Sequence, residues 1–185
     1  MIIETIALSF ILGKIRGGSI RNIGKLNINK WYIFVISFLL EIISLIFITK
    51  INVPLSGFLE KNFPYIHILT YLLLILGLIM NFQEKGLKLV LFGTTLNFFP
   101  IILNNGKMPV SLKALKISNL HTELALLEEG RILTHILACE STRLAILSDI
   151  IPIPKPYPLA KIISLGDIFI AIGLFILIQT YMKKD

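Results

Sequence analysis

Four long runs of apolar residues constrain the fold of this chain more than any other feature. They cover residues 32–49, 65–82, 87–103 and 161–182, and a shorter run covers residues 2–13. A helix that crosses the hydrocarbon core of a bilayer needs about 20 residues. Because 55% of the 185 residues are hydrophobic, the chain has more apolar surface than a soluble domain of this size can bury. The sequence therefore predicts an all-α fold, a polytopic membrane helix bundle with about five transmembrane helices.

The basic residues predict how these helices are oriented, because cytoplasmic loops of membrane proteins are enriched in lysine and arginine. The first connection carries five of them and no acid, the turn at 83–88 carries two, and two more lie near the end of the chain. The segments 50–64 and 104–160 then lie outside. The abundance of Ile, Lys and Asn is typical of a bacterial genome of low G+C content. We expect a multipass protein of the bacterial cytoplasmic (plasma) membrane, with its N-terminus outside and its C-terminus inside.

The polar segment 104–160 is predicted to form a partly helical loop on the outer face of a single integral membrane domain, residues 1–185. Its Asn105-Gly106 pair is a strong turn signal. Within 120–147, Gly130 separates two stretches with apolar residues at helical spacing, so we expect two amphipathic helices there. The proline-rich end of the segment predicts an extended strap that leads into the last helix.

Several functional classes are excluded by what the chain lacks. A net charge of +7 would suggest nucleic-acid binding in a soluble protein, but the basic residues flank apolar runs and no aromatic-rich polar platform accompanies them. No nucleic acid partner is therefore expected. No P-loop or glycine-rich dinucleotide motif is present, so no cofactor is predicted. His135 and Cys139 have the spacing of neighbours on a helix, but two donors alone do not predict a metal site.

Two aspartates, Asp149 and Asp167, are the candidate catalytic residues. Two carboxylates that share a site of low dielectric constant split their pKa values, which leaves one acid and one base to activate water. The structural alternatives are that Asp167 caps the last helix, because it follows the sequence Ser-Leu-Gly, and that Asp149 is a solvated acid paired with Arg143 or Lys155.

Other polar groups, among them Glu4, Glu41 and His67, also lie inside apolar runs. Glu41 is near the centre of its run, where a charged side chain is costly and should face a polar partner inside the bundle. Asn81 and Asn97 are the candidates for that partner, and the interpretation is a hydrogen bond within the bundle. His67 is interpreted as an interface or packing histidine.

The stretches "NNGKMPVS", "THILACESTRLAILSDIIPIP" and "SLGDIFIAIG" resemble a family of uncharacterised bacterial multipass membrane proteins, known only as a domain of unknown function. The likeness runs over nearly the whole chain and implies a membrane protein without an assigned activity. The matching residues are Asn105, Gly106, Met108, Pro109, Val110, Ser111, His135, Thr142, Leu144, Asp149, Pro152, Pro154, Ser164, Gly166, Asp167 and Gly173.

The C-terminal quarter is also similar to lipoprotein signal peptidase, in which an aspartate follows a short polar motif as the final helix enters the membrane. That resemblance implies that Asp167 matches the second catalytic aspartate of the family. The motif that carries the other catalytic aspartate of that family, GNxxDR, is absent from this chain. The residues around Asp149 therefore do not match the family.

The leading functional hypothesis is a site on the outer face that binds a lipid-linked or small amphiphilic ligand. The predicted ligand-binding residues are Asn105, Met108, Ser111, His135 and Arg143, because a turn, carboxylates and a histidine converge where an amphiphile's head group would lie. One alternative is an intramembrane aspartyl hydrolase, and another is an accessory subunit of a membrane complex. Besides the lipid bilayer, the partners considered are a second membrane protein and further copies of the chain.

Overall fold

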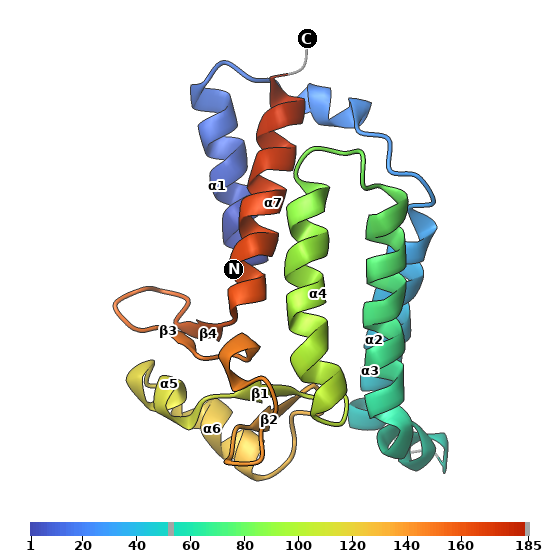
Figure 1. Ribbon diagram of the computed structural model, residues 1–185, viewed down its shortest axis with the longest axis vertical. Coiled ribbons are helices and arrows are strands. Elements are labelled where there is room, and N and C mark those ends of the chain that lie inside the picture. The colour runs from blue at the N-terminus through green and yellow to red at the C-terminus, as the bar shows by residue number, and fades with distance from the viewer. Residues whose placement is uncertain (52–53, 184–185) are drawn as a thin grey trace.

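Five long helices form a bundle, and a layer of short elements covers one of its ends (Figure 1). The computed structural model describes residues 1–51 and 54–183. The long helices are α1 (Ile2–Ile15), α2 (Tyr32–Lys50), α3 (Pro54–Met80), α4 (Leu87–Leu103) and α7 (Leu165–Met182). The short helical turn η1 (Ile20–Lys25) joins α1 to α2 at the opposite end.

Helices α4 and α7 pack so closely that their backbones touch. A Cβ atom at Gly93 would collide with the carbonyl oxygen of Gly166, and one at Gly173 would collide with that of Gly86. Small residues at such positions let helices approach closely. In lipid, which is as apolar as the helix surfaces, this close packing is a main source of helix association. Two pairs of glycines seven residues apart therefore hold α4 and α7 in register.

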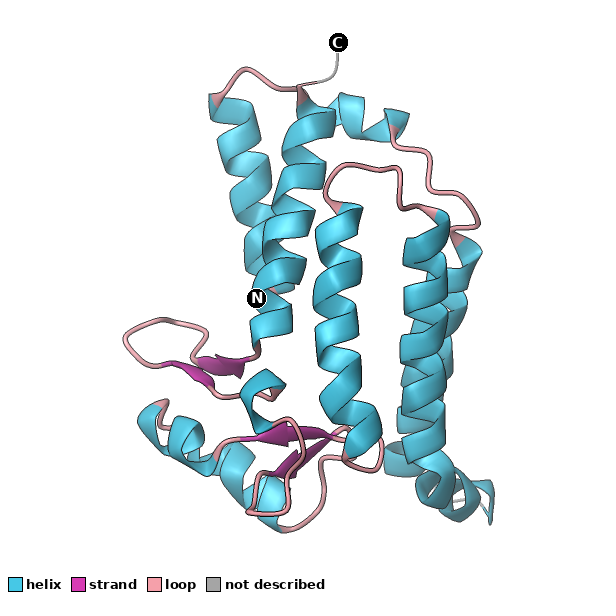
Figure 2. Cartoon of the chain, viewed as in Figure 1, coloured by secondary structure: helices cyan, strands magenta, loops and turns pink. Residues whose placement is uncertain are grey.

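The end layer is built by the polar segment and contains strands that the sequence did not predict (Figure 2). Strand β1 (Met108–Val110) pairs in parallel with β2 (His135–Leu137), and β3 (Ile151–Ile153) pairs antiparallel with β4 (Lys161–Ile163). The short helices of this layer are α5 (Leu112–Ile117), α6 (His121–Glu128) and η2 (Ala145–Leu147).

Three sequence predictions are corrected here. Only the first of the two amphipathic helices expected within 120–147 forms, because the segment that contains His135 becomes a strand paired with β1. The last helix begins at Leu165, since residues 161–163 belong to β4. Most of the expected outer loop 50–64 is the first part of α3.

Three helices in the described part of the chain are long and apolar enough to span a membrane: α2, α7 and residues Leu55–Met80 of α3. Helix α4 is also apolar but shorter, so the predicted count of about five spans is not confirmed. The outward faces of α2 and α3 carry many exposed large apolar side chains, including Ile36, Phe38, Leu72 and Ile79. This surface is compatible with a membrane protein.

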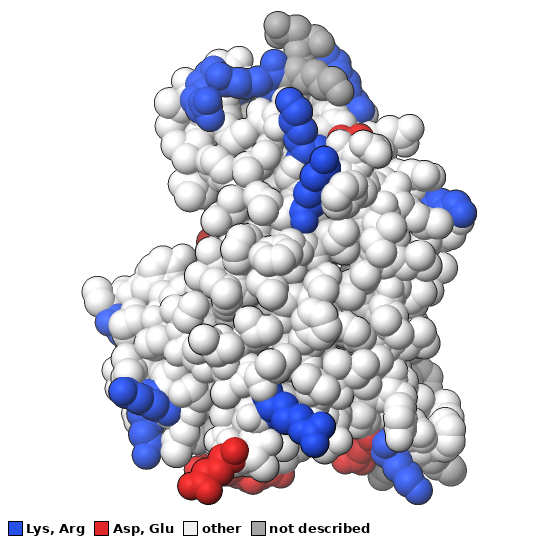
Figure 3. All heavy atoms as spheres, in the orientation of Figure 1, with Lys and Arg blue, Asp and Glu red and all other residues white. Residues whose placement is uncertain are grey.

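Charged residues gather at the two ends of the bundle and differ in sign between them (Figure 3). The end near the C-terminus presents almost only Lys and Arg, whereas the end with the short elements presents both signs. The exposed basic residues at the first end include Lys14, Arg16, Arg21, Lys25, Lys30, Lys85, Lys88 and Lys183.

Candidate functional site

A polar pocket of about 290 Å³ lies where the end layer meets the helix bundle. Helices α2, α3, α4 and α7 contribute side chains to it, and so do the strand β1 and the segments around β2 and β3. Its lining consists of Glu41, His67, Tyr71, Leu74, Asn97, Met108, Thr134, His135, Asp149 and Asp167. The fold thus brings both candidate catalytic aspartates to one cavity, together with two of the predicted ligand-binding residues, Met108 and His135.

Asp167 lies in the first turn of α7 and forms a capping box with Ser164. The Ser164 backbone N–H donates to the Asp167 carboxylate at 3.0 Å, and the Asp167 N–H donates to the Ser164 hydroxyl oxygen at 3.0 Å. The amide of Asn97 on α4 donates to the second carboxylate oxygen at 3.1 Å. The prediction that Asp167 caps its helix is confirmed, and the same carboxylate faces the pocket.

Asp149 is held beside β1 and contacts His135. Its backbone N–H donates to the carbonyl of Pro109 at 3.0 Å, and its carboxylate lies 3.5 Å from Nε2 of His135. Nδ1 of His135 lies 2.7 Å from the hydroxyl oxygen of Thr134. The alternative of a solvated acid paired with Arg143 or Lys155 is wrong, because Asp149 is buried and its partner is a histidine.

The environment of Asp149 changes its proton affinity. Burial raises the pKa of its carboxyl above the ordinary value, because a charged carboxylate loses hydration there. The contact with His135 opposes part of that rise, and the nearby charge of Asp167 adds to it. Asp149 is therefore easier to protonate than an aspartate in water.

Glu41 and His67 form a second pair of acid and histidine at the pocket. Oε1 of Glu41 on α2 lies 3.1 Å from Nδ1 of His67 on α3. The expected partners were wrong, since Asn81 binds backbone groups of Asn29 and Gly77 instead. Sequence reasoning placed neither residue at the site, although each is a polar group within an apolar run, and that signal could have found them.

An apolar cleft of about 530 Å³ lies along the bundle beside the polar pocket. Four residues line both spaces: Tyr71, Leu74, Asn97 and Asp167. Along α4 the cleft runs from Asn97 to Leu87, a distance of about 15 Å at a rise of about 1.5 Å per residue. The remaining lining is almost entirely apolar, with Ile2, Leu26, Ile28, Phe34, Leu78, Leu87, Val90, Thr94, Ile170, Leu174 and Leu177.

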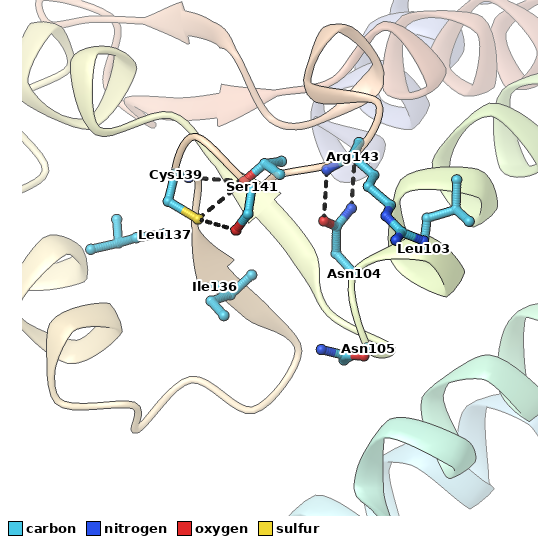
Figure 4. Close-up of a pocket in the computed structure, with 9 residues that line it drawn as sticks. Leu103, Asn104, Asn105, Ile136, Leu137, Cys139, Ser141 and Arg143 are labelled. Atoms are coloured by element: carbon cyan, nitrogen blue, oxygen red, sulfur yellow. Dashed lines mark hydrogen bonds between the residues drawn. The ribbon is translucent and has the colours of Figure 1, made fainter.

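The other predicted ligand-binding residues lie elsewhere. Asn105 and Arg143 line a separate hollow of about 300 Å³ next to Cys139 (Figure 4). There the side chain of Asn104 accepts a hydrogen bond from the backbone N–H of Arg143 and donates one to its carbonyl. Ser111 caps α5, accepting from the N–H of Ala114 at 3.3 Å, and it lines neither cavity.

The structure offers no support for a metal at His135 and Cys139. His135 is on a strand and faces the polar pocket, whereas Cys139 faces the separate hollow, so the two do not share a helix face. Among the described residues, no group of three or more His, Cys, Asp and Glu side chains could hold a metal ion.

Comparisons with known proteins identify a family but no activity. The model of a family of unknown function, DUF5317, matches residues 25–179. An uncharacterised protein of Thermotoga maritima is 32% identical over 176 residues, which cover 95% of this chain and 89% of that protein. No solved structure matches this chain. None of these findings shows a relationship to lipoprotein signal peptidase.

Proposed function

This chain belongs to the DUF5317 family of unknown function, and we propose from its site that it binds an amphiphile in a membrane. The head group occupies the polar pocket and the hydrocarbon chain occupies the apolar cleft. The observation that carries this proposal is that the two cavities are neighbours with a shared wall, because Tyr71, Leu74, Asn97 and Asp167 line both. A cavity with one polar and one apolar part matches a ligand with the same division.

The dimensions and the surroundings of the cavity support the proposal. The cleft follows α4 for about 15 Å, which suits an extended hydrocarbon chain lying parallel to the helices. The pocket lies where the end layer meets the bundle, away from the end that presents almost only Lys and Arg. By the positive-inside bias, that position is the outer face of the membrane.

Thermal stabilisation of the purified protein tests the proposal. In phosphatidylcholine nanodiscs, the Tm would be measured with dodecyltrimethylammonium, dodecanoate and dodecanol, which share one chain length. At least one of them should raise the Tm to a saturating value, because a ligand that binds only the folded state stabilises it. The variant Leu74→Trp, which places a larger side chain on the wall that the two cavities share, should lose this effect.

The variant Leu76→Trp is the matched control, since Leu76 lies on the same helix with its side chain exposed on the outer face. It should retain the response of the natural chain. If none of the three amphiphiles raises the Tm, or if both tryptophan variants respond alike, the proposed function is wrong.

A second candidate function, hydrolysis by an aspartate pair, is favoured by one observation: Asp149 and Asp167 line the same pocket. Their partners differ, since Asp167 caps α7 and contacts Asn97 while Asp149 contacts His135. Incubation with a lipid and lipoprotein extract, followed by mass spectrometry, tests it. A product formed by the natural chain should then be absent with Asp149→Asn and with Asp167→Asn.

A further inference from the structure

The polar pocket contains more acidic than basic side chains. Three carboxylates line it, from Glu41, Asp149 and Asp167, together with the imidazoles of His67 and His135. No lysine or arginine is among its described lining residues. When the carboxylates are ionised, the lining stays negative in every protonation state of the two histidines. A phosphate, sulfate or carboxylate head group would meet repulsion there and find no guanidinium or ammonium to pair with.

Asp167 differs from the other two acids because its partners are neutral. Glu41 and Asp149 each contact a histidine, whereas the carboxylate of Asp167 accepts hydrogen bonds from the Ser164 backbone and the Asn97 amide. Asp167 and Lys161 both line another hollow. The amine of Lys161 is paired there with the carboxylate of Glu4. Within the described residues, the negative charge of Asp167 thus has no paired cation in the pocket.

Tyr71 gives the pocket an aromatic wall next to these carboxylates. Its ring meets His67 edge to face with centroids 5.2 Å apart, and it stacks on Phe98 with centroids 6.3 Å apart. Neighbours on two sides thus fix the orientation of the ring. Its hydroxyl has no hydrogen-bond partner among the described residues, although it lines a polar cavity. An aromatic ring beside an acid is a common setting for an organic cation.

We propose that the head group bound in the polar pocket is a monocation, an amine or a quaternary ammonium, with Asp167 as its counter-ion and Tyr71 as its aromatic wall. This inference rests on the proposed function, because the cation is the polar end of the amphiphile whose chain fills the cleft. An unpaired carboxylate in a site of low dielectric constant is stabilised when a ligand supplies the missing charge.

The same three amphiphiles test this inference through their relative affinities, obtained from the dependence of Tm on concentration. Empty nanodiscs give the non-specific partitioning of each probe. Dodecyltrimethylammonium should bind at least about tenfold more tightly than dodecanoate, because the charges at the pocket attract one and repel the other. The variant Asp167→Asn, which keeps an oxygen to accept from the Ser164 N–H, should lose about tenfold in affinity for the cation.

The control for general surface charge is Glu60→Gln, since Glu60 is an exposed acid of α3 outside the pocket. It should leave the affinity for the cation unchanged. Dodecanol should bind the natural chain and Asp167→Asn equally, which shows that the variant is folded. If dodecanoate binds as tightly as the cation, or if Asp167→Asn keeps full affinity for the cation, the inference is wrong while amphiphile binding stands. The comparison of the three probes on the natural chain needs no variant, so it tests the inference even if Asp167→Asn does not fold.

Discussion

Helix α4 meets its two neighbours, α7 and α3, in opposite ways. Against α7, glycines face glycines and the two backbones touch at Gly93 and Gly166. Against α3, aromatic side chains make the contact, with the ring of Tyr71 stacked on Phe98. The space left beside that contact is part of the apolar cleft. The size of the residues on each face of one helix therefore decides which side is sealed and which can hold a ligand.

The largest expected effect comes from disrupting the contact between α4 and α7, the sealed side of α4. The change Gly166→Val puts a branched side chain against the Gly93 carbonyl, which cannot move without shifting α4. It also meets the Asn97 amide, which can move only by losing its hydrogen bonds to Asp167 and Ser164. We expect a loss of more than about 4 kcal/mol in the free energy of unfolding, enough to prevent folding of a marginal protein. The yield of monodisperse protein and its Tm would measure this.

The control for that change is Gly57→Val, because a Cβ atom at Gly57 of α3 meets nothing within 4 Å. This variant should fold with a nearly normal Tm. Equal stability of the two variants would show that the contact between α4 and α7 is not as close as described.

A smaller effect is expected from the polar group that links the sealed side to the pocket. Asn97→Ala removes the amide that donates to Asp167 and the oxygen that accepts from the Ser164 hydroxyl at 2.7 Å. Because both partners stay buried or half-buried, the change should cost about 2–3 kcal/mol of stability. Chemical or thermal unfolding would measure it, and a loss below about 0.5 kcal/mol would contradict this account of the α7 cap.

The next effect is the dependence of the free energy of unfolding on pH, through Asp149 in the polar pocket. Its pKa is raised in the folded chain, so between the ordinary pKa of 3.8 and the raised value the folded state binds more protons than the unfolded state. The stability contributed by the protonated carboxyl is present below pH 3.8 and falls as the pH rises through that window. Stability measured against pH should therefore decline less steeply in Asp149→Asn. An identical pH profile in that variant would contradict the raised pKa.

The smallest expected effect concerns the side of α4 that faces α3 and the apolar cleft, which we call the open side. Tyr71→Phe removes a hydroxyl without a hydrogen-bond partner among the described residues while keeping the ring between His67 and Phe98. The free energy of unfolding should change by less than about 0.5 kcal/mol. A Tm several degrees lower would show that the hydroxyl has a structural partner and that the open side is less permissive than described.

The helices of the bundle were predictable from the sequence because each is encoded by a continuous local signal. The runs expected at 32–49 and 87–103 match α2 and α4 to within one residue at each end. The start of α3 was missed because residues 55–64 include polar and turn-forming types, which tertiary packing accommodates within a helix. The strand β2 was missed because its three residues gain their hydrogen bonds from β1, which lies 27 positions earlier, Met108 against His135.

The candidate site was predictable only in part for the same reason. Asp149, Asp167, His135 and Met108 were singled out from the sequence, and all four line the polar pocket. Asn105 and Arg143 come from the same segment but line the separate hollow, because Asn105 lies in the turn before β1 and Arg143 in the turn after β2. Nothing local in the sequence indicates which side of a short turn faces a cavity.

The sequence by itself determined that the chain forms long apolar helices and that basic residues with few acidic neighbours gather at one end, and it offered a helix cap as one of two interpretations of Asp167. Each of these depends on neighbouring residues, through hydrophobic burial, charge or a cap. Only the tertiary structure decided that Glu41 meets His67 and that Asp149 meets His135 at one pocket. Those contacts join different elements, α2 with α3 and β2 with the segment before β3, so they depend on how the elements pack and not on neighbouring residues in the sequence.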